Sequence, residues 1–217
     1  MSVVSLLLDN LDAYARGVGV TVALTLSAFA FALAVGVVVA ACRISPVVPL
    51  RAAATLYVES IRNTPLLVLI FLFVFGLTKV GILFGYFTSA VIVLGCYTGA
   101  LVAETVRSGI NTVSLGQAEA ARALGFTFPK ALSRIILPQA LRRVVGPLGG
   151  LFVALIKNSA LASIISVVDL TGVADRVTTA TERPLEAFAI AGVAYVLLAV
   201  PAGLGVGWLE RRLAIHR

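Results

Sequence analysis

Few residues of this sequence can hold a metal ion. Its 217 residues include one histidine, His216, and two cysteines, Cys42 and Cys96, which lie in or beside apolar runs and do not form a spaced pair. A zinc or haem site needs several such ligands, so the sequence predicts no metal site and no cofactor in this chain. We expect both cysteines to serve in packing.

Phosphate-binding and catalytic motifs are also missing. Each of Lys79, Lys130 and Lys157 follows a residue other than glycine, so the sequence has no G-x-x-x-x-G-K-[ST] loop. It has no G-x-S-x-G turn, and no histidine in an apolar run, which disfavours an intramembrane enzyme. We therefore expect a protein that does not bind ATP by itself and is not an enzyme.

Charged residues make up only 12% of the chain, whereas hydrophobic residues make up 60%, with a mean hydropathy of +1.06. Apolar runs long enough to cross about 30 Å of hydrocarbon predict an all-α membrane protein. We expect a single transmembrane domain over residues 1–217. Its five helices are predicted at about 18–42, 52–77, 80–104, 144–168 and 187–209. The run from Val18 is about twice as long as a signal-peptide core and is expected to stay attached.

The basic residues are distributed unequally between the two sides of this topology. Four lie on one side: Arg16, Lys79, Arg176 and Arg183. Eleven lie on the other: Arg43, Arg51, Arg107, Arg122, Lys130, Arg134, Arg142, Arg143, Arg211, Arg212 and Arg217. The positive-inside rule then predicts an outside N-terminus, an inside C-terminus and a cytosolic 105–143 segment. The net charge of +7 indicates topology and contact with anionic lipid, not nucleic-acid binding.

A polar, basic segment at 114–138 interrupts the apolar runs. Ser114 and Gln117 fit a capping box at the start of a helix, and Gly125 fits a left-handed helix stop. Thr127 can cap a second helix, which Pro138 cannot continue without a kink because it lacks an amide hydrogen. The sequence predicts two short helices at an angle, on the cytosolic side.

This segment resembles the EAA loop of permease subunits of bacterial ABC importers. It has E-A-A at 119–121, three residues, Gly125, nine residues, Ile135, one residue, and Leu137-Pro138. Other stretches are similar to the polar amino acid permease group. They are Tyr57-Val58-Glu59, Arg62-Asn63-Thr64-Pro65-Leu66, Ala103-Glu104 with Arg107-Ser108-Gly109-Ile110, Leu137 to Arg142, and Lys157-Asn158-Ser159. The likeness covers roughly 21–209 and is greatest to glutamate-uptake permeases of Gram-positive bacteria.

The resemblance implies a multi-pass subunit of the bacterial cell membrane that works by alternating access. Its implied partners are a second permease subunit, two ABC ATPase subunits that hold ATP and Mg, an extracellular or periplasmic amino acid-binding protein, and membrane lipid. The residues implied in ATPase coupling are Glu119, Ala120, Ala121, Gly125, Ile135, Leu137 and Pro138. Whether the second permease subunit is an identical copy is left open.

Polar residues in the second apolar run predict a structural pair and a break. Glu59 and Arg62 are three residues apart on one helical face and could pair with each other. Pro65 disfavours helix at the residue before it, and irregular backbone at membrane depth is tolerated only beside protein or a cavity. Arg62, Asn63, Thr64 and Pro65 are therefore candidates for lining or gating the substrate path.

Two further groups lie in the third run. Glu104 and Arg107 are spaced to form an interfacial ion pair, with a structural or gating role. Tyr97 and Thr98 lie deeper and could line a small polar site, or could simply pack between helices.

The main substrate candidates are Lys157, Asn158 and Ser159, which interrupt an apolar helix. A buried cation there needs an anion or a broken helix end. The wider family often has Asp where this chain has Asn158, so the site is expected to suit an extra carboxylate better than a second cation. Glutamate, or a related acidic or amide amino acid, is the predicted substrate. The alternative is that Lys157 pairs with a carboxylate of the partner subunit.

Two other functions remain open from the sequence. One is a permease for a basic or other polar amino acid. The other is an ATP-independent secondary transporter, although five helices without an inverted repeat disfavour that architecture.

Overall fold

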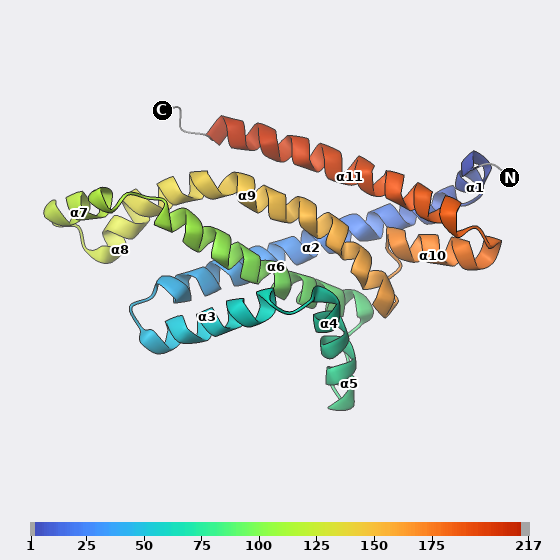
Figure 1. Cartoon of the computed structure of the whole chain (residues 1–217), viewed down its shortest axis with the longest axis horizontal. Helices are drawn as coiled ribbons and strands as arrows, with labels where there is room; N and C mark the ends of the chain where they lie inside the picture. The colour runs from blue at the N-terminus through green and yellow to red at the C-terminus, as the bar shows by residue number, and fades with distance from the viewer. Residues whose placement is uncertain (1–2, 214–217) are drawn as a thin grey trace.

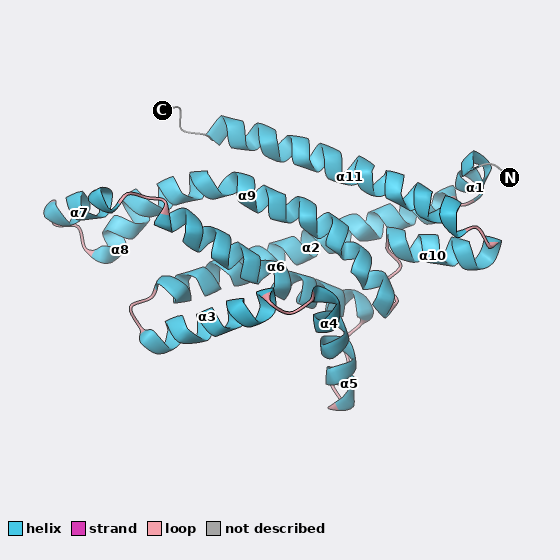
Figure 2. Cartoon of the chain, in the orientation of Figure 1, coloured by secondary structure: helices cyan, strands magenta, loops and turns pink. Residues whose placement is uncertain are grey.

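The structure, a computed structural model, describes residues 3–213, and within them every regular element is helical (Figures 1 and 2). The tail that carries His216 lies outside this range. The α-helices are α1 Val3–Asp9, α2 Leu11–Ile44, α3 Val48–Arg62, α4 Leu66–Phe71, α5 Leu77–Lys79, α6 Tyr86–Asn111, α7 Leu115–Ala123, α8 Phe128–Ala131, α9 Leu137–Asn158, α10 Leu170–Thr181 and α11 Pro184–Leu213. A π-helical turn at Leu72–Gly76 joins α4 to α5, another at Leu132–Ile136 joins α8 to α9, and a 3₁₀ helix at Ser159–Ile165 follows α9.

Four helical segments of the described chain are long and apolar enough to span a membrane. They are Leu11–Ile44, Tyr86–Asn111, Leu132–Ile165 and Pro184–Leu213. The helices Val48–Arg62 and Leu66–Lys79 form a fifth span only if they are taken together, and they are bent by 108°. The break predicted at Pro65 is therefore present, and the span predicted over 52–77 consists of these two helices.

The observed helix bounds also differ from the predicted ones. The first span begins at Leu11, not near 18, because its polar first turns stay helical although they lower the local hydropathy. The third begins at Tyr86, since Gly81 has a φ of +80° and the chain turns before it. The fourth continues from α8 through Pro138, and the sequence did not predict α1 or α10.

The helices α2 and α6 pack against each other along most of their length, at the centre of the molecule. Glycines make this approach close. A Cβ atom at Gly36 would lie 2.9 Å from the carbonyl oxygen of Gly99, and a Cβ at Gly99 would lie 3.3 Å from that of Ala32. In lipid, such backbone proximity is a main source of helix association. The helix α9 packs on α6, and α11 packs on α9 and α10 (Figure 1).

A buried aspartate that the sequence did not single out fixes α10. Asp169 caps this helix by accepting a hydrogen bond from the Gly172 amide at 2.9 Å, and the Tyr195 hydroxyl donates to its other oxygen at 2.8 Å. The next amide, of Leu170, donates to Thr21 Oγ1 at 3.1 Å. Burial raises the pKa of the Asp169 carboxyl above its usual range, and the hydrogen bond from Gly172 partly offsets this. These contacts join α10 to both α2 and α11.

We expect Gly36→Val to destabilise the protein by about 1–3 kcal/mol, because the side chain would push α6 away from α2. Gly19→Val is the matched control, since it lies in the same helix and a Cβ there has no heavy atom within 4 Å. Thermal unfolding of the detergent-solubilised protein measures both. Equal melting temperatures for the two variants would contradict the close-packing role of Gly36.

Candidate functional site

A cluster of charges centred on Glu104 joins three helices. The Glu104 carboxylate pairs with Arg107 in the same helix and with Arg43 at the end of α2, and its Oε2 lies 3.6 Å from Nη1 of Arg62, the last residue of α3. Arg43 also lies 4.0 Å from Glu59, and its side chain is only 8% exposed. Removing Glu104 would therefore leave a nearly buried guanidinium without its main partner.

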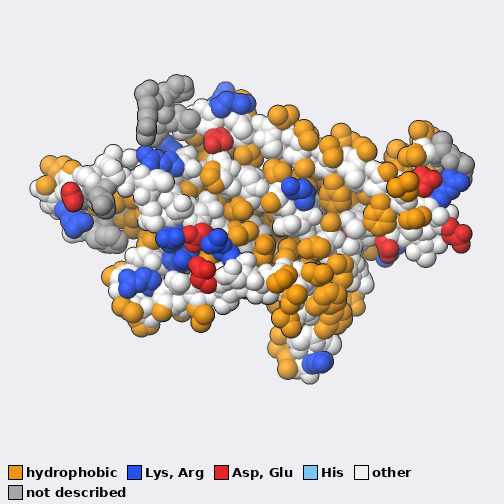
Figure 3. Space-filling view, in the orientation of Figure 1, with side chains coloured by type: hydrophobic (Ala, Val, Ile, Leu, Met, Phe, Trp, Pro, Cys, Tyr) orange, Lys and Arg blue, Asp and Glu red, His pale blue; other side chains and the backbone are white. Residues whose placement is uncertain are grey.

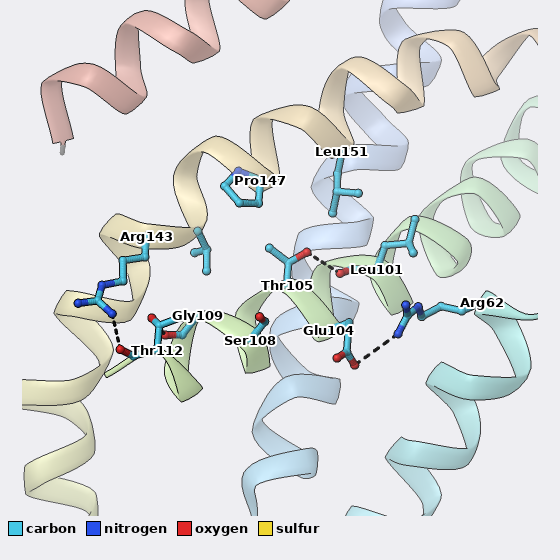
Figure 4. Close-up of a pocket in the computed structure, with 11 residues that line it drawn as sticks. Arg62, Leu101, Glu104, Thr105, Ser108, Gly109, Thr112, Arg143, Pro147 and Leu151 are labelled. Carbon is cyan, nitrogen blue, oxygen red and sulfur yellow. Dashed lines mark hydrogen bonds and ion pairs between the residues drawn. The ribbon is translucent and has the colours of Figure 1, made fainter. Parts of the chain in front are cut away.

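The predicted Glu104–Arg107 ion pair is present, but the expected pairing of Glu59 with Arg62 is not among the ion pairs of residues 3–213. Glu59 faces Arg43, and Arg62 turns toward Glu104 (Figure 4). The sequence missed the role of Arg43, because its partner carboxylates lie far along the chain. One feature of the sequence could have indicated this role: Arg43 is a cation in the last turn of an apolar helix, where it needs an anionic partner.

A cavity of about 440 Å³ adjoins this cluster, between α3, α6 and α9 (Figure 4). Arg62 and Glu104 form part of its wall, with the hydroxyl side chains of Thr105 and Ser108 further along α6 and of Thr112 directly after it. Arg143, from α9, donates a hydrogen bond to the Thr112 carbonyl at the other end. The cavity is thus bounded by cations at both ends and could admit a small polar molecule.

The break after α3 is stabilised by its own side chains. Asn63 Nδ2 donates to the Glu59 carbonyl and Thr64 Oγ1 to the Ser60 carbonyl, each at 2.8 Å. These bonds satisfy carbonyls at the end of α3, where Pro65 prevents the helix from continuing. Of the four candidates in this stretch, Arg62 is the one that lines the polar cavity.

Tyr97 and Thr98 do not share that cavity. Tyr97 lines a different hollow of about 400 Å³ between α3, the first π-helical turn and α6, whose other walls are mainly aliphatic and aromatic. Thr98 is buried, with 3% of its surface exposed. The geometry is that of side chains packed between helices.

The Lys157-Asn158-Ser159 cluster lies where α9 changes into the 3₁₀ helix. Ser159 is buried and donates to the Ile156 carbonyl at 2.7 Å, and Asn158 is half-buried. The expectation of a buried Lys157 is wrong for this chain, because its side chain is exposed. The 3₁₀ helix packs against α4, so the two interrupted helices that the sequence singled out meet in space.

The 114–138 segment forms the predicted helix, reversal and second helix. Gly125 has a φ of +79°, and the bonds from its amide to the Arg122 carbonyl and from the Phe126 amide to the Ala121 carbonyl form a Schellman motif. Ser114 stands at the N-cap without a side-chain cap bond, and the side chain of Gln117 pairs with Gln139 of α9. The predicted capping box is therefore incomplete.

The motif residues of this segment divide into two sets. Ala121 is buried, and Ile135 and Leu137 are half-buried, so these side chains pack within the chain. The exposed set is Glu119, Ala120, Gly125 and Pro138. The helix does not end at Pro138: an irregular, π-helical turn at Leu132–Ile136 precedes it, and the chain continues as α9. A wider turn lets the helix accommodate a residue that cannot donate a backbone hydrogen bond.

We expect Glu104→Gln to lower the free energy of unfolding by about 3 kcal/mol, because it breaks the pairs of a nearly buried Arg43. Glu59→Gln is the matched control. Its side chain is 53% exposed and lies at the limit of ion-pair distance from Arg43, so its loss should cost less than about 1 kcal/mol. Thermal unfolding of both variants tests this, and equal destabilisation would show that Glu104 is not the centre of the cluster.

Known proteins resemble the chain over nearly its whole length. Residues 16–215 match the family model described as the binding-protein-dependent transport system inner membrane component. The probable glutamine ABC transporter permease protein GlnM of Bacillus subtilis is 41% identical, with 97% of each chain covered. The glutamate transport system permease protein GluC of Corynebacterium glutamicum is 40% identical, with 83% of this chain and 85% of the other covered.

Solved structures agree with these relatives. The crystal structure of an amino acid ABC transporter with histidines matches with a TM-score of 0.93 and 33% identity, and the match covers 98% of this chain and 99% of the other. An inward-facing structure of the MetNI methionine ABC transporter has a TM-score of 0.79 at 21% identity, which supports the fold alone.

The relatives are transport components, so this chain is a transport subunit and not an enzyme, as the sequence predicted. Its family implies separate ATPase and substrate-binding proteins as partners. The chain belongs to the family of binding-protein-dependent transport system inner membrane components, and it is a multi-pass permease of an amino acid ABC importer in the bacterial plasma membrane.

Proposed function

We propose that this importer takes up glutamate or a related acidic or amide amino acid. The observation that carries the proposal is the pair of Lys157 and Asn158 at the end of α9. The exposed ammonium of Lys157 has no carboxylate partner among residues 3–213, so its charge is available to an anionic group outside this chain. A neutral amide beside it adds no carboxylate that would favour a second cation. The names of the GlnM and GluC relatives point to the same substrate class.

The path is proposed to run past the two interrupted helices. Arg62 ends α3 at the polar cavity, while Lys157 lies in the last turn of α9, next to the 3₁₀ helix that packs on α4. Irregular backbone at membrane depth occurs where it is covered by protein or lines a water-filled cavity. Asn63, Thr64, Pro65 and Ser159 would then shape the path through the backbone, whereas Arg62 and Lys157 would act through charge.

The exposed face of the 114–138 segment is proposed to dock on the ATPase. Hydrogen bonds of this segment support its action as one body with the membrane helices. Gln117 of α7 pairs with Gln139 of α9, and Arg143 of α9 donates to the carbonyl of Thr112, between α6 and α7. A displacement of the docked segment would therefore move α6 and α9 together. ATP and Mg would be held by the ATPase, with none in this chain.

Alternating access follows from these parts. The binding protein delivers the amino acid to one face, two ATPase subunits close on ATP, and a second permease subunit completes the path. Each state would be favoured by a different set of partners, which shifts the population between them.

The charge distribution supports a cytosolic position for the α7 end. Lys and Arg side chains gather near α7, α3 and the adjoining part of α6 on the face shown in Figure 3. The opposite end, with α1 and α10, carries Asp9, Asp12, Asp175 and Glu182. By the positive-inside rule, the N-terminus would lie outside and the C-terminus inside.

Lys157→Met is expected to lower glutamate-stimulated ATP hydrolysis about tenfold or more, because a charge-assisted hydrogen bond to substrate is lost. The assay uses the importer reconstituted with its ATPase and binding protein, and it compares glutamate, glutamine, histidine and arginine. Lys79→Met, an exposed lysine at the end of α5, is the control. Unchanged stimulation would remove Lys157 from the path, and failed assembly would assign it to contact with the partner subunit.

Gly125→Val is expected to weaken ATPase binding in a pull-down assay and to reduce transport. A β-branched residue at a φ of +79° costs about 1–3 kcal/mol, so the reversal between α7 and α8 would distort. Gly116→Val is the control, since that glycine also has open space for a Cβ but no positive φ. Normal pull-down and normal transport by the Gly125 variant would refute docking through this turn.

A further inference from the structure

A groove of about 450 Å³ lies between α2 and α10, at the end of the molecule opposite α7 (Figure 1). It is separate from the polar cavity next to Glu104. Its walls consist of residues from one face of each helix and one residue of the loop before α10. The lining residues are Asn10, Ala13, Arg16, Gly17 and Val20 of the α2 side, Val173, Arg176, Val177 and Ala180 of α10, and Val168.

The two helices run antiparallel along this groove. Leu170, at the start of α10, bonds to Thr21, and Val173 contacts Gly17, one turn earlier in α2. Arg176 lies a further turn along α10, at about the level of Ala13 in α2, and Arg16 lies between that level and Gly17. The register thus brings two guanidinium groups, from distant parts of the sequence, to one groove.

Both arginines are exposed, and neither forms an ion pair with a carboxylate of the part of the chain that the structure describes. Asp12 and Asp175 are near them in the sequence but do not line the groove. Guanidinium groups bind phosphate with a planar set of donors, so two that line one groove form a good phosphate site.

Below the arginines the groove becomes apolar. Val20 lies one turn deeper in α2 than Arg16, about 6 Å along the helix axis, and Val168 and Val173 adjoin it on the other wall. Since α2 is a membrane span, this direction leads toward the hydrocarbon. The order of a charged opening and an apolar interior matches an amphiphile that lies in the membrane.

We propose that this groove binds an anionic phospholipid, with the phosphate at Arg16 and Arg176 and part of an acyl chain along Val20, Val168 and Val173. A protein carboxylate could reach the arginines, but a soluble partner would leave the apolar interior unfilled. Membrane lipid supplies both parts in one molecule. The bound lipid would hold α10 against α2 beside the junction that Asp169 makes with α11.

The test is lipid binding by the complete importer in nanodiscs that contain phosphatidylglycerol and phosphatidylcholine. Native mass spectrometry counts retained lipids, and titration with phosphatidylglycerol gives an affinity. The double variant Arg16→Gln, Arg176→Gln is expected to bind phosphatidylglycerol about tenfold or more weakly. Each cation that is removed should lower the affinity roughly fivefold. Lys79→Gln, an exposed cation outside the groove, should bind as the unaltered importer does.

A second variant tests the acyl part without altering charge. Val20→Trp would fill the apolar interior, because Val20 lies one turn deeper in α2 than Arg16, and it should also weaken phosphatidylglycerol retention, with normal assembly and ATP hydrolysis. The proposal would be overturned if the double variant bound phosphatidylglycerol as tightly as the unaltered importer does. It would also be overturned if the double variant retained lipid but no longer bound the binding protein, because the arginines would then belong to a protein interface. Unchanged lipid retention by Val20→Trp would refute the acyl-chain site.

Discussion

The close contact between α2 and α6 is the constraint on which the rest of the molecule depends. Lipid tails are as apolar as the side chains they cover, so helices gain little from hiding apolar surface and associate mainly through dispersion at short range. Gly36, Gly95 and Gly99 permit that range, since a Cβ at each would meet backbone oxygen or a side chain of the other helix. The Glu104 cluster lies toward the end of this seam and adds α3 to it. With the seam set, α9 has a fixed surface to pack on, and α11 follows α9.

Local patterns predicted those features that depend on neighbouring residues. The lengths of the apolar runs gave the main spans, Pro65 gave the break, and Gly125 gave the reversal with its positive φ. The pairing of Glu104 with Arg107 followed from helical spacing alone. For the break, the reversal and the ion pair, the decisive interaction is closed within about one helical turn, so no tertiary information was required.

Features decided by packing between distant segments were missed. Arg43 and Arg62 converge on Glu104 only because α2, α3 and α6 lie together, and Glu59 loses its expected partner for the same reason. Hydropathy did not indicate α10, because the polar residues of this helix alternate with the residues of its buried face. It also did not indicate the N-terminal cap that Asp169 provides. The continuation of the helix through Pro138 was also not predicted, because it depends on a π-helical turn in the preceding residues. The exposure of Lys157 depends on which helices flank the end of α9, which composition does not encode.

The Schellman turn at Gly125 closes all of its hydrogen bonds between residues 121 and 126. Its shape is therefore specified by a few neighbouring residues and owes little to the helices that carry it. Such a connector is modular, because the membrane helices can diverge while the segment that we propose to dock on the ATPase keeps its form. Under that proposal, transplanting the segment between permeases would require matching contacts such as those made by Gln117 and Thr112.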